Sequence, residues 1–504
     1  MKNLIIIVCV FLGTAIQAQV LKEFRTGFRT IFINPVDVNS YYFGFNPALL
    51  TVNPEDELLS LSTDFSLSDG EFKRFVDPKS NHFYQLRASG RKAIDTSQNF
   101  KGSFSLHRSE RNDWTWIFTR DYQTSNPFLI GDSTTGNSRL NGIQMTAEYS
   151  NKIIENLSIG IALDYSVDEM LKEISPRPTS EHRDIQARLG LNFSAFSELN
   201  LGIVADIYDK NEELSYREDE GSITQETIIL KFKGYDFPNV LRKKTETRYS
   251  YTNGYAGGLN FSYNLARSIL AAGYIFSGFD KTIIKDDAID PSAEGLWMNN
   301  NLTAGLQLFA DVEEQIKFGL IYNGRIDDGW AKYSPYNVLY YEREGSEHSA
   351  ACGMQYSFNN KISAGLELGA SFNSHNEHDY YSTVENYINS NLYFGRAGLG
   401  ITWSDEFYSI ISYAFHNRTI PEFSFISKDQ SDYFNYYRKE DILYLLTESS
   451  GHELSFSAKI TPKFWGSFYI YFNWMSNTPK NASYFTGRIR NEFKSSIEYR
   501  VKIY

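Results

Sequence analysis

Apolar and polar residues alternate along most of this chain, in segments of about ten residues joined in pairs by short polar turns. From residue 157 the odd positions are Leu157, Ile159, Ile161, Leu163 and Tyr165. Polar or small residues stand between them, and the same period returns over 199–207 and 362–372. A period of two predicts strands with one apolar and one polar face.

Repeated along the chain, this pattern predicts an all-β protein, a transmembrane antiparallel up-and-down β-barrel with apolar side chains toward lipid and polar side chains inward. Eight tight hairpins give about sixteen strands, and the last strand with one or more strands between 58 and 94 completes a ring of roughly 18, within a range of about 16 to 20. A large soluble β-sandwich or propeller would also alternate. It would need a second apolar layer of equal area, which no segment supplies.

The turns predicted between the strands fall into two sets, short periplasmic turns and long extracellular loops. Tight turns are predicted near 109–112, 151–155, 196–198, 264–267, 311–314, 359–361, 404–406 and 461–463. Longer polar segments are 121–138, 167–182, 209–248, 280–296, 327–345, 375–387 and 417–450. Two of these, 209–248 and 417–450, are long enough to fold over a pore or project outward. Residues 224–232 are rich in strand formers and predict a hairpin that extends beyond the membrane.

The first residues have the pattern of a secretory signal peptide. Lys2 is followed by an apolar run over 4–16 and by small residues at 15–18. Removal of 1–18 would leave Cys352 as the single cysteine, so a disulfide is excluded. We therefore divide the chain into a signal peptide (1–18), an N-terminal segment (19–56) and a barrel (57–504), and we expect the cell outer membrane as its location.

The composition agrees with a barrel and argues against helical membrane proteins and nucleic-acid-binding proteins. The mean hydropathy is −0.39 and no later run reaches about 18 apolar residues, which excludes helical membrane spans. The net charge is −12 without a basic patch, which argues against nucleic acid as a partner. Aromatic residues make up 16 % of the chain, as expected if girdles of Tyr and Phe lie at both membrane interfaces.

The end of the chain alternates again. Phe493, Ile497, Tyr499, Val501 and Ile503 are separated by charged and polar residues. This resembles the C-terminal signal of bacterial outer-membrane proteins, which implies the barrel assembly machinery as a partner. Tyr504 is one residue out of phase with that signal, and an ordinary edge strand stays open as an interpretation.

A short motif precedes the first predicted strand. Asn46-Pro47-Ala48 resembles the N-terminal element of the long-chain fatty-acid transporter family, in which such a segment enters the barrel as a hatch. The interpretation as a turn stays open because Asn-Pro commonly begins turns. The chain is longer than that family's pattern. In general style it resembles the uncharacterised outer-membrane β-barrels of Bacteroidota, of about 500 residues.

No motif predicts an enzyme, a cofactor or a metal. His182 and Asp184 lie near a loop base, where a barrel hydrolase would place its rim site, but no known nucleophile motif is present. His375-Asn376-Glu377-His378-Asp379 offers metal-ligand types. Adjacent strand residues point to opposite faces, so His378 and Asp379 are poorly placed to act together. We predict no catalytic, cofactor-binding or metal residue.

The polar phase of the strands predicts the inner wall. It mixes glycines with charges, and the lumen-facing candidates are Asp164, Arg188, Asp206, Lys317 and Glu367. The charges of both signs can pair across strands, and the glycines can make room for a plug or for aromatic rings.

The first hypothesis for function is a passive or substrate-selective channel for a small solute, gated by the N-terminal segment or by a folded-in loop. The second is a non-catalytic accessory barrel of a secretion or surface complex, whose long loops bind a protein. The expected surroundings are the lipid bilayer and lipopolysaccharide.

Overall fold

The computed structural model describes residues 46–51, 58–121, 126–217, 228–235, 238–242, 245–266, 268–287, 289–313, 315–427, 439–462, 466–480 and 484–502. The predicted signal peptide and the last two residues of the predicted C-terminal signal lie outside these ranges, as do residues 19–45 of the N-terminal segment. In the described part of the chain, no helix has the length and hydropathy to cross a membrane.

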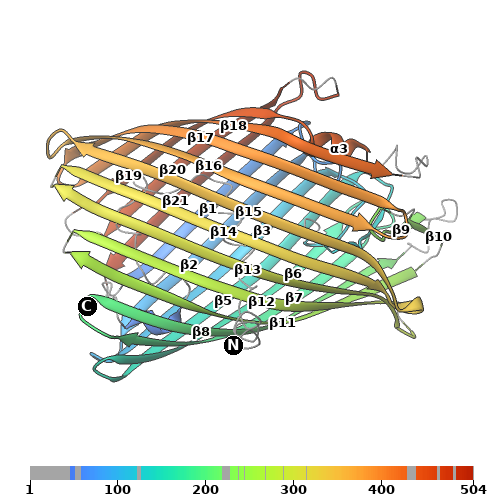
Figure 1. Ribbon diagram of the computed structural model, residues 1–504, viewed down its shortest axis with the longest axis horizontal. Coiled ribbons are helices and arrows are strands. Elements are labelled where there is room, and N and C mark those ends of the chain that lie inside the picture. The colour runs from blue at the N-terminus through green and yellow to red at the C-terminus, as the bar shows by residue number, and fades with distance from the viewer. Residues whose placement is uncertain are drawn as a thin grey trace.

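Eighteen antiparallel strands form one sheet that closes on itself, because β1 pairs with both β2 and β21 (Figure 1). The barrel strands are β1 (Leu58–Gly70), β2 (Ser80–Ala93), β3 (Gln98–Trp114), β5 (Gly136–Ile154), β6 (Leu157–Lys172), β7 (Thr179–Ser194), β8 (Leu199–Arg217), β11 (Thr245–Ala266), β12 (Ile269–Asp286), β13 (Ser292–Glu313), β14 (Ile316–Tyr333), β15 (Val338–Ser357), β16 (Ile362–Asp379), β17 (Val384–Ser404), β18 (Phe407–Ser427), β19 (Ser449–Ile460), β20 (Ser467–Pro479) and β21 (Arg490–Lys502). The predicted fold and strand number are confirmed.

Six shorter elements accompany the barrel within the described ranges. They are η1 (Pro47–Leu50), β4 (Ile130–Asp132), β9 (Ile228–Lys231), β10 (Asn239–Arg242), η2 (Ser334–Tyr336) and α3 (Lys439–Leu445). β4, β9 and β10 form a separate sheet of three strands. β9, β10 and α3 lie at the end of the barrel opposite the chain's C-terminus (Figure 1).

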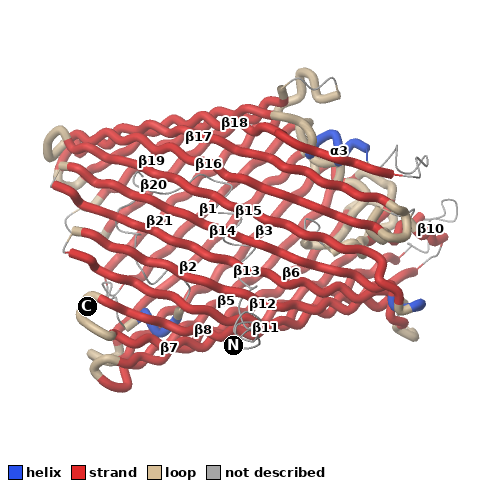
Figure 2. Tube along the Cα trace, viewed as in Figure 1, coloured by secondary structure: helices blue, strands red, loops and turns tan. Residues whose placement is uncertain are grey.

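All connections of more than six residues lie at one end of the barrel, and the other end has only short turns (Figure 2). Seven of the predicted tight turns fall at or beside short connections, but the turn predicted at 109–112 is wrong. Those residues lie inside β3, and the turn is at 94–97. There the Asp95 carboxylate accepts hydrogen bonds from the backbone N–H groups of Ser97 and Gln98, at 2.7 and 2.8 Å.

The apolar outer belt covers only the half of the barrel nearer the short turns. On β7 the outward side chains Leu189, Leu191 and Phe193 are 44–56 % exposed, and the same outward face becomes charged at Arg183 and Glu181. Several strands reach 20 to 22 residues, about twice the 9–11 needed to span a bilayer. The wall therefore continues well beyond the belt toward the long loops.

This tall wall explains why the predicted loops are too long. Segments such as 167–182, 209–248, 327–345 and 375–387 are largely strand at both ends, and their loops shrink to 173–178, 218–244, 334–337 and 380–383. Above the belt the outward face is mostly charged or polar, and the inward face mixes polar residues with apolar ones that pack against the mouth loops, so the simple alternation disappears. The extended hairpin predicted at 224–232 is also wrong for its described part. β9 folds into the small sheet instead, where it pairs with β4 and β10.

Replacement of Leu366 by arginine tests the assigned outer face. Leu366 lies on β16 in the apolar belt and is 51 % exposed. We expect Leu366→Arg to lower the free energy of unfolding by about 2–4 kcal/mol, the cost of a lipid-facing arginine near the bilayer midplane. Reversible folding into lipid vesicles measures it. Ile362→Arg, at the short-turn end of the same face, should cost about 0–1 kcal/mol. Equal effects of both variants would contradict the assigned belt.

Candidate functional site

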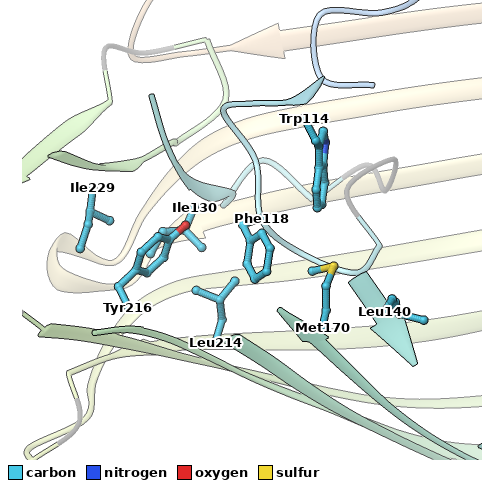
Figure 3. Packing of buried hydrophobic residues seen from close by; sticks show 8 residues of the cluster. All are labelled: Trp114, Phe118, Ile130, Leu140, Met170, Leu214, Tyr216 and Ile229. Carbon is cyan, nitrogen blue, oxygen red and sulfur yellow. The ribbon is translucent and has the colours of Figure 1, made fainter. Parts of the chain in front are cut away.

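A folded-in lid occupies the long-loop end of the barrel. We define the lid as the described residues of 115–135 and 228–242, which include β4, β9 and β10. Its apolar side chains Phe118, Ile130 and Ile229 pack in one buried cluster with inner-wall residues of β3, β5, β6 and β8 (Figure 3). The wall residues are Trp114, Leu140, Met170, Leu214 and Tyr216. The lid is therefore a packed part of the fold.

The lid also contacts the facing part of the wall. Phe128 packs in a second buried cluster with Trp297, Tyr340 and other side chains of β12–β15, and Tyr235 packs against this cluster. The backbone N–H of Tyr235 donates to Asp379 Oδ2 at 2.7 Å. The Tyr235 hydroxyl donates to the Glu377 carboxylate on β16. The lid thus reaches from β5–β8 to β12–β16 and crosses the mouth.

Buried ion pairs join the lid to the wall. Lys231 Nζ of the lid lies 2.7 Å from Glu246 Oε1 and 2.7 Å from Asp286 Oδ2. Arg248 donates to both oxygens of Asp286, at 2.7 and 2.8 Å. On the other side, Lys172 Nζ of the wall lies 2.7 Å from the lid residue Asp132. These side chains are at most 8 % exposed, so each charge depends on its partner.

Arg120 fastens the lid to the histidine and aspartate pairs of the wall. Its guanidinium lies 2.6 Å from Asp168 and 2.9 Å from Asp184. His107 and His182 approach the other oxygens of these carboxylates, at 2.7 and 3.2 Å. Burial by itself would lower the pKa of Arg120. The nearby carboxylates of Asp121 and Asp184 outweigh burial and raise that pKa to well above its ordinary value. The His182 and Asp184 pair noted in the sequence thus contacts a fixed cation of the lid.

A second group of loops closes the rest of the mouth. Arg74, between β1 and β2, donates to both oxygens of Asp441 on α3, at 2.9 and 2.6 Å. The Phe72 ring lies 5.0 Å from Tyr444 and 5.4 Å from Phe485. This group joins the lid where Phe75 stacks on Trp116, at 5.4 Å between ring centroids.

At the opposite end, η1 lies against the inner wall. Asn46 caps η1 by accepting a hydrogen bond from the Ala48 N–H at 3.0 Å. Its amide donates to the Leu191 carbonyl at 2.8 Å and to Asn260 Oδ1 at 3.1 Å. Arg91 of β2 donates to the Leu50 carbonyl at 2.7 Å. Asn46 and residues 48–50 are at most 1 % exposed.

Three wall glycines make room for this segment. A Cβ at Gly160 would lie 2.4 Å from the backbone of Pro47 and Ala48, and a Cβ at Gly190 would lie 2.0 Å from Asn46 Oδ1. A Cβ at Gly202 would lie 2.3 Å from the Asn46 amide. All three distances are shorter than any real contact. Asn46, Pro47 and Ala48 thus sit inside the barrel, as a hatch would, and their role in transport stays a prediction.

The five predicted lumen residues lie on the inward phase but in three separate places. Asp164, Arg188 and Asp206 are neighbours on β6, β7 and β8, with Arg188 Nε 3.6 Å from Asp206. Glu367 pairs with Arg396 on β17 at 3.7 Å. Lys317 lies near the short-turn end of β14, in register with Asp311. They do not form one site.

The possible metal ligands over 375–379 are divided by the wall. His375 and Glu377 point inward, 2.9 Å apart, whereas His378 lies on the outward phase and is 3.7 Å from Glu385. Among the described residues, no group of three or more His, Cys, Asp or Glu is arranged to hold a metal ion.

Residues 47–500 match the model of a family of unknown function, DUF6850. The chain belongs to this family. The match begins at η1 and ends in the last strand, so the family covers the barrel together with its inner segment. No curated protein matches the chain in sequence.

Solved structures with a similar arrangement are outer-membrane barrels of low sequence identity. The Pseudomonas putida toluene transporter TodX has 9 % identity and a TM-score of 0.32, with 92 % of this chain and 94 % of that chain covered. The CymD monoaromatic hydrocarbon channel has 12 % identity and a TM-score of 0.33, with 95 % and 99 % covered. The siderophore receptor PiuA from Acinetobacter baumannii has 6 % identity and a TM-score of 0.40, with 89 % and 82 % covered. At these values the function of a DUF6850 chain has to come from its own residues.

Sequence reasoning missed the residues that hold the lid. Lys172, Lys231, Arg248 and Asp286 stand in segments that read as polar loops, and their partners are distant in sequence. One signal was present, the run of strand formers that includes β9 within a polar region. A short apolar strand in an otherwise polar loop of a barrel indicates a segment with a buried face.

Proposed function

We propose that this protein is a gated outer-membrane channel for small, uncharged polar solutes, closed at its outer mouth by the lid. The observation that carries the proposal is that the lid is anchored on both sides of the mouth, at Asp132 by Lys172 of β6 and at Tyr235 by Asp379 of β16. A barrel of 18 strands is wide enough to hold an aqueous channel. A lid built of packed strands and ion pairs gives that channel a closed state.

The inner wall supports an uncharged solute. It carries many buried hydroxyl and amide groups: Asn99, Ser105, Ser109, Ser150, Ser158, Asn192, Asn260, Ser262, Asn299, Asn301, Ser349, Ser371, Ser412, Ser455 and Asn473. Its charges occur in pairs of opposite sign, such as Arg188 with Asp206 and Arg396 with Glu367 and Glu453. Ion-selective pores instead use rings of charged side chains of one sign. Paired charges leave hydrogen bonding as the main chemistry offered to a solute.

Solute flux through reconstituted barrels tests the proposal. We expect wild-type protein in liposomes to pass small sugars slowly, and a variant with residues 228–242 replaced by a short Gly/Ser linker to pass them at least about tenfold faster. A single-sign cluster focuses ions of opposite charge, so a wall of paired charges should give nearly equal permeability to small cations and anions. Folding of both proteins is compared by heat-dependent mobility in gels. A folded variant without flux would contradict the channel, and strong ion selectivity would contradict the solute class.

The alternative function is a non-catalytic accessory barrel that binds a protein partner. Exposed apolar side chains at the long-loop end favour it, because aromatic residues are enriched at interfaces. Tyr336 and Tyr381 are 76 % and 70 % exposed, and Phe423 is 57 % exposed. Residues 433–437 form a further aromatic stretch in the sequence and lie outside the described residues. Cross-linking in intact cells followed by gentle solubilisation would recover a stoichiometric partner if this function holds.

The remaining expectations belong to the same proposal. They are export by the signal peptide, assembly by the barrel machinery, an outer leaflet of lipopolysaccharide around the wall, and kinship with barrels of Bacteroidota and with the long-chain fatty-acid transporters. The apolar belt supports the membrane location, because it is a continuous band of exposed large apolar side chains.

A further inference from the structure

A hollow of 470 Å³ lies on the outer face where β21, β1, β2 and β3 meet, at the strands that close the ring. We call it the seam groove. Thr63 and Ser495 are its small outward residues. Long apolar side chains stand around them: Phe65, Tyr84, Leu86, Leu106, Phe472 and Ile497. The volume is within the range of about 300–1,000 Å³ found for sites that hold small molecules.

The position of the groove identifies what can fill it. Leu86, Leu106 and Ile497 are 43–50 % exposed and belong to the apolar belt, so the medium around the groove is acyl chains. Small residues among long ones leave the outer surface concave, and a concave apolar surface in a bilayer is filled by a lipid chain. The groove faces lipid and lies outside the channel.

A cation marks the end of the groove nearer the long loops. The Arg108 side chain lines the groove and is 45 % exposed. Its Nε and Nη2 both donate to Glu110 Oε1, at 2.9 and 2.5 Å, and Arg139 beyond it pairs with Glu173 at 3.1 Å. Apolar residues thus give way to charged ones at Arg108, as at a membrane surface. A guanidinium retains donors for a phosphate when one carboxylate occupies part of its fork.

We propose that the seam groove binds an anionic lipid of the outer leaflet, with one acyl chain over Thr63 and a lipid phosphate on Arg108. The proposal rests on the outer-membrane location proposed above and is independent of the solute. The bound chain fills the surface across the β1 and β21 junction, where the first and last strands of the ring meet. Lipid A fits this chemistry because it carries several acyl chains and phosphate.

Native mass spectrometry of the detergent-solubilised full-length protein tests this with two probes, lipid A and a diacylglycerol of matched chain length. We expect wild type to retain one lipid A. Thr63→Phe fills the groove and should weaken the binding of both probes by at least about tenfold. Arg108→Gln should weaken the binding of lipid A about tenfold and leave the binding of the diacylglycerol unchanged, because the substitution removes only the phosphate contact. Ser495→Phe fills the groove from the neighbouring strand and replaces Thr63→Phe if that variant does not fold.

The matched control is Ala205→Phe, which adds the same ring to the outward face of β8, far from the seam. It should leave lipid A binding unchanged. Lipid A binding that survives both filling variants, or that falls equally in the control, would overturn the groove. Binding that does not respond to Arg108→Gln would overturn the phosphate contact. If these lipid experiments fail while the variant with 228–242 replaced still passes solute, only the lipid site is wrong. A protein that does not insert into liposomes would contradict both proposals.

Discussion

Lys231→Met should open the lid. The substitution leaves the Glu246 carboxylate, 2 % exposed, without the ammonium that lies 2.7 Å from it. Removal of one partner from a buried ion pair costs about 3–5 kcal/mol, and the lid can relieve that cost by detaching from the wall. Because about 1.4 kcal/mol changes an equilibrium tenfold, the ratio of open to closed lid should rise at least about a hundredfold. Single-channel recording in planar bilayers measures it as open probability.

The control for this variant restores neutrality at the same place. Lys231→Met combined with Glu246→Gln removes both charges and keeps the volumes similar, so most of the closed state should return. Asp286 retains the two hydrogen bonds from Arg248 in both variants. If the single and the double variant have the same open probability as wild type, the ion pairs do not hold the lid, and the channel is closed elsewhere.

The barrel itself could be predicted from the sequence, because its main constraint is local. A strand in the apolar belt needs an apolar side chain at every second position, and that requirement is visible from Leu157 to Tyr165 without knowledge of any neighbour. The strand number follows from the count of short turns. Above the belt the constraint ends, since the outward face is mostly charged or polar there and the inward face mixes polar residues with apolar ones under the lid. For this reason the sequence predicts a turn at 109–112, inside β3, and loops that are too long.

The lid could not be predicted, because its contacts are made between residues far apart in sequence. Tyr235 and Asp379 are 144 positions apart, and Lys172 and Asp132 are 40 apart. β4 and β9 have three and four residues, too few to show a period. The inner segment could be predicted in part. Asn46, Pro47 and Ala48 stood out as a motif, but only the structure shows that Gly160 and Gly190 are the wall residues that receive it.

Gly160→Val should expel η1 from the inner wall. The added Cβ would lie 2.4 Å from the Ala48 nitrogen and from the Pro47 carbonyl carbon, and both are backbone atoms that cannot rotate away. Displacement breaks the two hydrogen bonds that Asn46 donates, and each buried group left without a partner costs about 1–3 kcal/mol. In a Cys352→Ser background, a cysteine at Ala48 should react with a water-soluble maleimide at least about tenfold faster when Gly160 is valine.

Gly90→Val on β2 is the matched control for that experiment. A Cβ at Gly90 meets its nearest atom, Leu59 Cδ1, at an ordinary 3.6 Å, so the same side chain fits there without displacing the backbone. The cysteine at Ala48 should then stay as slow to react as in the parent protein. Slow labelling in the Gly160 variant would mean that η1 tolerates the clash. Fast labelling in the parent itself would mean that Asn46 to Ala48 leave the wall readily, so that this inner segment moves even while the lid is closed.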